Sequence, residues 1–248
     1  MVRNLPVFNI NIVEVDPDRP TGVYLKDPDP AGSRVHYYRA GSAASAMGPH
    51  TRLPDGARLV HVSGITPALS AGCAALADRL LAPDRPRGGP LVSFDVNHRP
   101  ALWSADRAAP HLLRLAAGAD AVFVGADEAA RLWGARGAEE VRGLLPGVPL
   151  LVVKDAGADA VCFSEEGTER VPALKTGIVE PVGAGDAFAA GFLSGLLRGL
   201  PVRGRLRLGH LMAAACLTAP GDTAPPPPRE VRDRLLAADE QAWRSAVL

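Results

Sequence analysis

The chain has 248 residues, enough for one large domain with a small appendage, and its 27 basic and 27 acidic residues leave no overall charge to favour nucleic acid or an anionic membrane. Cys73, Cys162 and Cys216 are widely separated, so they predict core thiols rather than a disulfide framework or a zinc site. Because no apolar stretch approaches a membrane span and the first residues lack a signal-peptide core, we expect a cytoplasmic protein.

Short strands joined by turns are predicted at the start of the chain. The ranges with β-branched and aromatic character are residues 8–15, 22–26 and 33–39. If the second and third strands pair, Tyr24 and Tyr37 can share a face, and alternation places Arg39 on the same side as Tyr37. Strand propensity alone leaves open that these are ordinary strand aromatics.

The middle of the chain predicts strands that alternate with helices. The expected strands are residues 58–63, 90–95, 120–124 and 150–154, and the expected helices are residues 71–81, 105–117, 125–133 and 137–145. This alternation is typical of a parallel sheet with crossover helices. Residues 160–164 and 169–171 then predict a hairpin.

Polar residues follow the strand predicted at residues 90–95. Asp95, Asn97 and Arg99 lie just past its carboxyl end, which is where open α/β sheets place ligands. Turn capping by Asp95 and Asn97 is the alternative. We interpret His98 as a surface or loop histidine rather than a base.

A glycine-rich turn, Pro181-Val182-Gly183-Ala184-Gly185-Asp186, opens a predicted buried helix that stops near Gly199. The glycines let the backbone approach a ligand, and the free N–H groups and positive dipole at a helix start favour an anion. Asp186 in the same turn fits a base that takes a proton from a hydroxyl attacking a phosphoryl group. The alternative is a turn whose acidic residue merely suits a helix start.

Two further helices are predicted in the remainder of the chain. The first covers residues 205–218 and contains His210, which we interpret as a core or groove histidine. The second follows a run of four prolines and extends from Arg229 to about Trp243.

The pattern Pro-Val-Gly-Ala-Gly-Asp-Ala-Phe-x-Ala-Gly-Phe resembles the C-terminal signature of the PfkB, or ribokinase-like, carbohydrate kinases. Residues 19–26 and 34–45 resemble the 2-keto-3-deoxygluconate kinases within that family. The resemblance implies an α/β fold, a ribokinase-like three-layer sandwich, with a β lid in residues 1–45 and a core in residues 46–248. It also implies transfer of phosphate from ATP, with Mg²⁺, to a hydroxyl of a sugar acid.

The resemblance also assigns site residues. It implies that Gly183, Ala184 and Gly185 hold the transferred phosphate and that Asp186 is the catalytic base. The implied sugar-acid contacts are Tyr24, Tyr37, Arg39, Asn97, Arg99 and Asp186, and the implied nucleotide contacts are Lys154, Gly157, Gly183, Gly185 and Gly221. Glu128 matches the glutamate of a magnesium motif, although Gly125 replaces the asparagine, and the alternative for Glu128 is a first-turn acid that stabilises a helix.

Two other functions stay open from the sequence. A kinase for a neutral sugar such as ribose or fructose is one, although two arginines facing a neutral ligand would be poorly compensated. The other is a catalytically inactive member that binds nucleotide or sugar, because the glycine pair that begins the family has no match between Met1 and Asp16. Strand edges left unpaired by that difference would favour a homo-oligomer through the β lid.

Overall fold

The computed structural model describes residues 14–27, 34–85 and 88–248. The strand predicted at residues 8–15 therefore lies almost entirely outside the described residues. Within them, no helix combines the length and the apolar character needed to cross a membrane.

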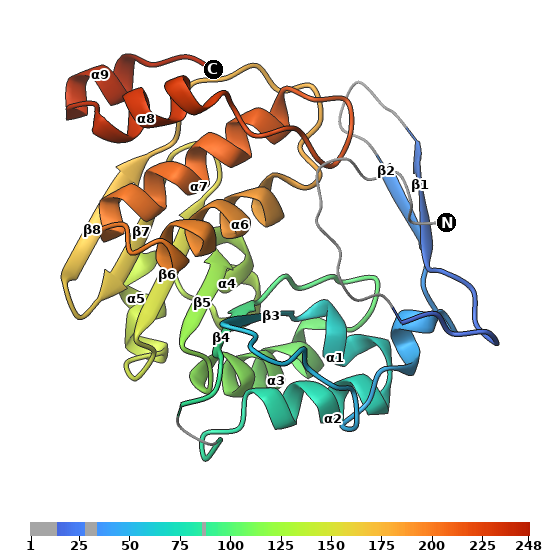
Figure 1. Cartoon of the computed structure of the whole chain (residues 1–248). Coiled ribbons are helices and arrows are strands. Elements are labelled where there is room, and N and C mark those ends of the chain that lie inside the picture. Colours follow the sequence, from blue (N-terminus) through green and yellow to red (C-terminus); the bar gives the residue numbers. More distant parts are fainter. Residues whose placement is uncertain (1–13, 28–33, 86–87) are drawn as a thin grey trace.

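A central sheet runs through the described part of the chain in the strand order β3-β4-β5-β6-β7-β8 (Figure 1). The first four strands are parallel: β3 (Leu59–Ser63), β4 (Leu91–Asp95), β5 (Ala121–Gly125) and β6 (Leu150–Asp155). The antiparallel strands β7 (Asp159–Ser164) and β8 (Gly167–Pro172) extend it. The parallel sheet and the hairpin predicted from the sequence are both confirmed. These strands could be recognised because strands covered on both faces consist of nearly continuous apolar residues.

Helices cover both faces of the sheet (Figure 1). One layer contains α1 (Ile65–Leu69), α2 (Ala71–Leu80), α3 (Ala105–Ala117), α4 (Ala126–Trp133) and α5 (Ala138–Leu144). The other contains α6 (Ala184–Leu197), α7 (Val202–Leu217), α8 (Arg229–Ala237) and α9 (Glu240–Ser245). Because β3 to β6 follow one another in both sequence and space, right-handed crossovers place α1 to α5 on the same face. The expected three-layer α/β/α sandwich is confirmed.

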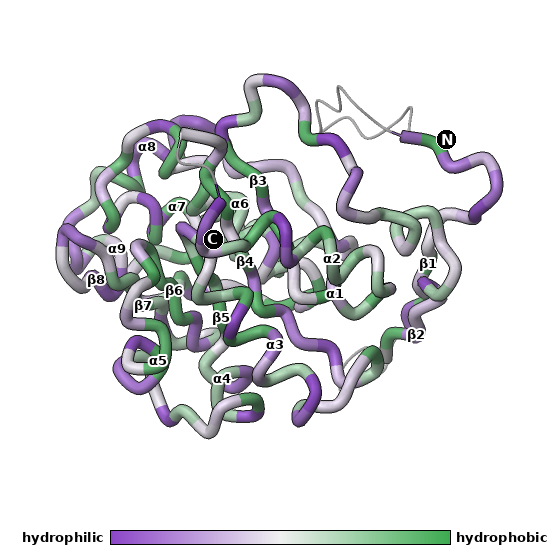
Figure 2. The backbone as a smooth tube through the Cα atoms, turned by 90° about the horizontal axis from the view of Figure 1, so that it is seen from below, coloured by the Kyte–Doolittle hydropathy of each residue, from purple (hydrophilic) through white to green (hydrophobic). Residues whose placement is uncertain are grey.

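Each face of the sheet has its own apolar core. Phe94 and Leu112 belong to the core beneath α1 to α5, whereas Phe123 and Phe192 belong to the core beneath α6 and α7, where their rings meet edge-on with centroids 5.4 Å apart. Figure 2 shows the hydrophobic residues concentrated along the strands and the inner helices. Burial of a side chain of this size stabilises the fold by about 1.5–3 kcal/mol. The three cysteines are buried and free, as predicted.

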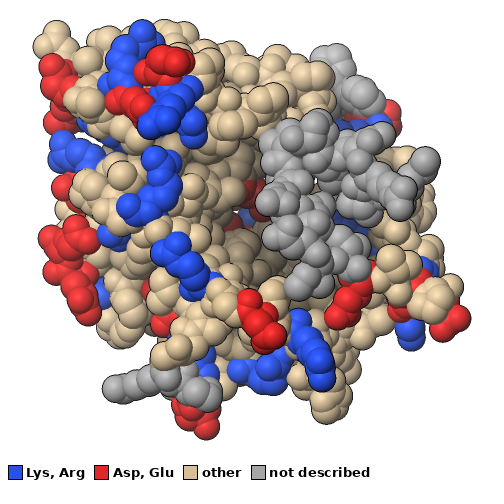
Figure 3. Space-filling model, viewed as in Figure 1, with Lys and Arg blue, Asp and Glu red and all other residues tan. Residues whose placement is uncertain are grey.

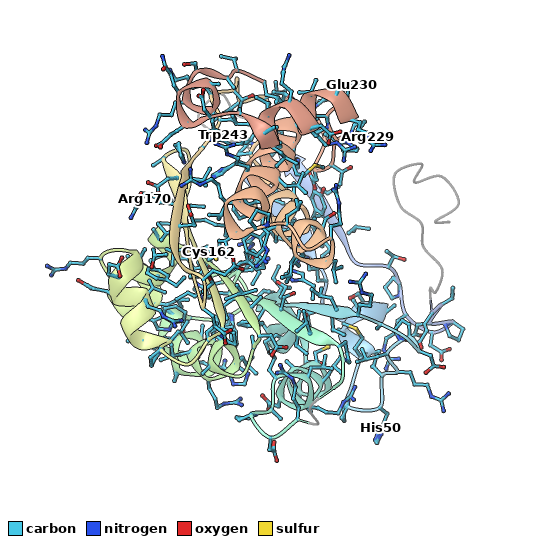
Figure 4. The ribbon with its side chains drawn as sticks, turned by 60° about the vertical axis from the view of Figure 1, so that its left-hand side comes forward. His50, Cys162, Arg170, Arg229, Glu230 and Trp243 are labelled. Carbon is cyan, nitrogen blue, oxygen red and sulfur yellow. The ribbon has the colours of Figure 1, made fainter. Side chains whose placement is uncertain are left out.

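The single helix expected from Arg229 to about Trp243 is wrong, because the structure divides it into α8 and α9. Ala238 and Asp239 are extended, and the Asp239 carboxylate caps α9 by accepting the N–H of Ala242 at 2.7 Å. The break turns Trp243 inward, where its indole N–H donates to the Pro172 carbonyl at 2.9 Å (Figure 4). Hydrophobic spacing carried across residues 229–243 gave no indication of this bend.

The strands β1 (Val23–Asp27) and β2 (Arg34–Tyr38) form a separate antiparallel hairpin, hereafter the lid, beside the sandwich (Figure 1). Tyr24 lies opposite Tyr37, and their ring centroids are 5.9 Å apart. The guanidinium of Arg39 lies 4.1 Å from the centre of the Tyr37 ring. The shared face that alternation predicted is therefore confirmed. The short 3₁₀ helix η1 (Ala43–Ala46) leads from the lid into the core.

Candidate active site

A cleft of about 970 Å³ lies where the lid faces the carboxyl ends of the parallel strands and the start of α6. Figure 3 shows a hollow near the middle of one face of the molecule, with acidic and basic side chains interspersed around it. The sequence-predicted residues that line the cleft are Tyr24, Tyr37, Arg39, Asn97, Arg99, Glu128, Lys154, Gly183, Gly185 and Asp186. Ala184 begins α6 between two lining glycines, whereas Gly157 and Gly221 are not among the described residues that line the cleft.

The turn before α6 depends on glycine at position 183. Gly183 has a φ of 91°, in the left-handed region that side chains disfavour. A β-carbon there would lie 2.1 Å from the Asp222 carbonyl oxygen, so the turn also needs the space that a side chain would occupy. With glycine, the chain enters α6 sharply, and residues of the first helical turn line the cleft, so the start of the helix can accept an anion there.

Asp186 lies in the first turn of α6 and is exposed at the cleft. The adjacent Gly185 is also exposed, so its backbone is accessible to a ligand. A carboxylate beside an anion site can accept a proton from a hydroxyl that attacks the bound anion. The arrangement therefore permits the base role predicted for Asp186.

Lys154 supplies a cation next to this turn. Its Nζ atom lies 2.8 Å from Oδ2 of Asp95, and a β-carbon built on Gly185 would lie 3.8 Å from Nζ. Lys154 lies near the carboxyl end of β6 and Asp95 ends β4, so the parallel sheet itself brings the two charges together. The Asp95 carboxylate is 5% exposed, so solvent screens this pair less than it screens a surface ion pair.

Glu128 caps two loops instead of gathering with other acids. One carboxylate oxygen accepts the N–H of His98, and the other accepts the N–H of Gly125 at 3.3 Å. Burial raises the pKa of Glu128, and the Asp95 carboxylate adds to that increase. Across the described ranges, no group of three or more His, Cys, Asp or Glu side chains could hold a metal ion. The helix-stabilising alternative is thus seen directly, and a metal role for Glu128 stays a prediction.

One end of the cleft is formed by the lid and by the loop after β4. Asn97, at a left-handed φ of 40°, donates from its amide to Oγ of Ser63 at 3.0 Å. Arg99 follows and donates to the His98 carbonyl at 3.3 Å. His98 is a loop histidine as expected, but it is buried instead of exposed, with Nε2 3.1 Å from the Trp103 carbonyl oxygen.

Several lining residues were missed by sequence reasoning. Asp127 and Arg131 face the cleft from α4 and form an ion pair at 3.3 Å. Thr223 also lines it, whereas the neighbouring Asp222 belongs to the loop of residues 221–222 that the sequence associated with the nucleotide. The i, i+4 spacing of Asp127 and Arg131 was a readable signal of their pairing, but nothing in the sequence placed that pair at the cleft.

A sandwich of this kind, with a glycine turn at a helix start, a carboxylate beside it and a lidded pocket, has the arrangement expected of a phosphotransferase that acts on a small molecule. The family model described as pfkB family carbohydrate kinase matches residues 8–229. The chain belongs to this family of carbohydrate kinases, which transfer phosphate to a hydroxyl group.

Individual relatives agree with this assignment. The chain is 36% identical over 244 residues to the 2-dehydro-3-deoxygluconokinase of Thermoproteus tenax, with 92% of this chain and 72% of the relative covered. It is 33% identical over 241 residues to the enzyme of the same name from Bacillus subtilis (strain 168), with the same coverage. Among solved structures, a PfkB protein from Polaromonas sp. JS666 matches with a TM-score of 0.72 and 34% identity, covering 89% of this chain and 71% of its own.

Proposed function

We propose that this chain transfers the γ-phosphate of ATP to a hydroxyl of a sugar acid of the 2-keto-3-deoxygluconate type. The names of the two relatives support the sugar acid, since 2-dehydro and 2-keto describe the same carbonyl. The cleft adds support of its own, because it carries cations suited to a carboxylate as well as an anion site suited to phosphate.

The observation that carries the proposal is the pairing of charges in the cleft. Its lining cations are Arg39, Arg99, Arg131 and Lys154. Arg131 pairs with Asp127, and Lys154 pairs with Asp95. Among the described residues, neither Arg39 nor Arg99 forms an ion pair with a carboxylate of the protein. A substrate carboxylate would provide the missing partner, whereas a neutral sugar would leave both cations uncompensated.

The reaction uses the chain's own groups as follows. Asp186 takes the proton of the acceptor hydroxyl as its oxygen bonds to the γ-phosphorus, and the bond to the β–γ bridging oxygen breaks to release ADP. The amides of Ala184, Gly185 and Asp186 hold the charge that develops on the transferred group. Lys154 adds a positive charge close to Gly185. Tyr24 and Tyr37 present rings and hydroxyl groups to the sugar acid.

The phosphates of the nucleotide would supply more of the Mg²⁺ ligands at this site than the protein would. Mg²⁺ keeps several waters and is bound by one or two carboxylates together with substrate phosphates, so the lack of a described acidic cluster is compatible with it. Glu128 would hold the ion through water, because both of its oxygens already accept backbone N–H groups. The ion would neutralise phosphate charge.

An assay for ADP formation tests the proposal. We expect turnover with ATP and 2-keto-3-deoxygluconate, and much slower turnover with fructose or ribose. Asp186→Asn should abolish turnover while nucleotide and sugar-acid binding persist, and Asp84→Asn, an exposed carboxylate elsewhere, should behave like the unmodified protein. Faster turnover of a neutral sugar would favour the neutral-sugar kinase, and binding without any turnover would favour the inactive member.

A second copy of the chain would cover the outer face of the lid. Val23, Leu25 and Tyr38 share that face and are more than half exposed, so pairing of two lids would remove apolar surface from water. Sedimentation should show a dimer that Leu25→Lys weakens, whereas a monomer at all concentrations would contradict this.

Three expectations from the sequence stay predictions: a lid in residues 1–45, a core in residues 46–248 and a cytoplasmic location.

A further inference from the structure

The inner face of the lid carries a lysine that does not line the cleft. Tyr24 and Lys26 are two residues apart in β1 and therefore point to the same side of the hairpin. Tyr24 faces the cleft, whereas Lys26 extends past it to the sandwich. This side chain is one of only three lysines in the whole sequence, with Lys154 and Lys175.

Two carboxylates of the sandwich receive this ammonium. Nζ of Lys26 lies 3.0 Å from Oε2 of Glu180, and it also donates to Oδ1 of Asp222. The three side chains are 18%, 8% and 26% exposed, so solvent screens the cluster only partly. Solvent screens an ion pair shielded in this way less than it screens an exposed pair, and removal of the cation would take a contact away from both carboxylates.

Both acidic residues contact the turn that begins α6, Glu180 through its carboxylate and Asp222 through its backbone. Glu180 accepts the N–H of Val182 at 3.0 Å, two residues before the start of the helix. The carbonyl of Asp222 is packed so closely against Gly183 that a β-carbon would lie 2.1 Å from its oxygen. A movement of either acid would therefore shift the phosphate-binding backbone, and Lys26 connects that backbone to the lid.

We propose that Lys26 is a positioning residue that couples closure of the lid to the phosphate-binding turn. The proposal rests on the proposed function only for its kinetic consequence. When Lys26 is seated between Glu180 and Asp222, the lid side chains Tyr24 and Tyr37 are held over the cleft and the turn before α6 is fixed. Lys26 itself touches neither the sugar acid nor the phosphate.

Hydrogen exchange tests the structural half of the proposal without any need for activity. Lys26→Met keeps the length of the side chain and removes its charge, Lys26→Arg keeps the charge, and Lys175→Met makes the same chemical change at an exposed lysine outside the site. We expect the amides of β1 and β2 to exchange about 10-fold faster in Lys26→Met and to remain near the unmodified rate in the other two variants. Equal exchange in Lys26→Met and the unmodified protein would overturn the proposal.

Kinetics test the coupling. In Lys26→Met we expect the KM values for sugar acid and for ATP both to rise by about 10-fold, because the lid and the turn are loosened together. Lys26→Arg should restore both values, and Lys175→Met should leave them unchanged. Faster exchange of the lid with unchanged KM values would show a merely structural contact and overturn the coupling. If no sugar acid is phosphorylated even by the unmodified protein, the proposed function fails, and the exchange experiment still decides whether Lys26 holds the lid.

Discussion

Replacement of Gly183 by alanine tests whether the turn before α6 determines activity. A left-handed φ of 91° costs an L-residue about 1–2 kcal/mol. The new β-carbon would lie 2.1 Å from the Asp222 carbonyl oxygen, so one of the two backbones must move by about 1 Å to restore an ordinary contact. Strain and overpacking together should lower the free energy of unfolding by about 2–4 kcal/mol. A displacement of about 1 Å in positioning backbone should lower kcat/KM by about 100-fold.

Gly199, just beyond the other end of α6, provides the matched control. Its φ is 71°, and a β-carbon there would meet nothing within 4 Å. Gly199→Ala should therefore lose only the about 1–2 kcal/mol of backbone strain and keep its activity. Urea unfolding and the ADP-release assay measure the two quantities. If Gly183→Ala matched Gly199→Ala in both, the contact between Gly183 and Asp222 would have no functional weight and the reasoning would be refuted.

Three other changes have clear expected results. Lys154→Met leaves the Asp95 carboxylate buried without its cation, so urea unfolding should show a loss of about 2 kcal/mol, below the about 3–5 kcal/mol of a fully buried pair because Lys154 is 19% exposed; an unchanged midpoint would argue against that pair. Burial lowers the pKa of His210 from 6.5 to about 4. Between pH 6.5 and pH 4 the unfolded chain therefore binds a proton at this histidine that the folded chain does not bind. The free energy of unfolding should fall by about 3 kcal/mol as the pH drops through that range. His210→Gln should flatten that part of the profile, and an equally steep profile would contradict this cause. Trp243→Ala should lower the free energy of unfolding by about 3–5 kcal/mol, measured by thermal or urea unfolding. A loss no larger than that of a substitution at an exposed position would show that α9 is not part of the core.

Much of the fold could be predicted because its signals are local. Residues 105–117 were predicted as a helix with the bounds that α3 has, since the apolar positions recur at helical spacing. The break between α8 and α9 was not predictable in the same way. Ala238 and Asp239 are compatible with a helix, and it is the distant contact of Trp243 with Pro172 that accompanies the bend. Tertiary contacts of this kind override local preference.

The candidate site was predictable in composition but less so in pairing. The glycine turn and Asp186 form one continuous motif, so their proximity follows from the sequence alone. Lys26 and Asp222, by contrast, are 196 residues apart, and no local pattern indicates that the lid reaches the loop after α7. The hydrogen bond from the backbone N–H of His98 to Glu128 was unpredictable for the same reason. It forms because the chain after β4 and the chain after β5 lie side by side.

The position of Lys154 shows why these long-range pairs matter for the chemistry. A flexible lysine would have to be ordered each time a phosphate arrived, and that ordering would oppose catalysis. Here the Asp95 carboxylate, itself buried at the end of β4, already fixes the ammonium near Gly185. An ammonium has three donors, so the bond to Asp95 leaves others for a phosphate oxygen. In the proposed reaction, the sheet would thus supply a positive charge that is already in position before the reaction begins. Electrostatic stabilisation of a transition state is most effective under that condition.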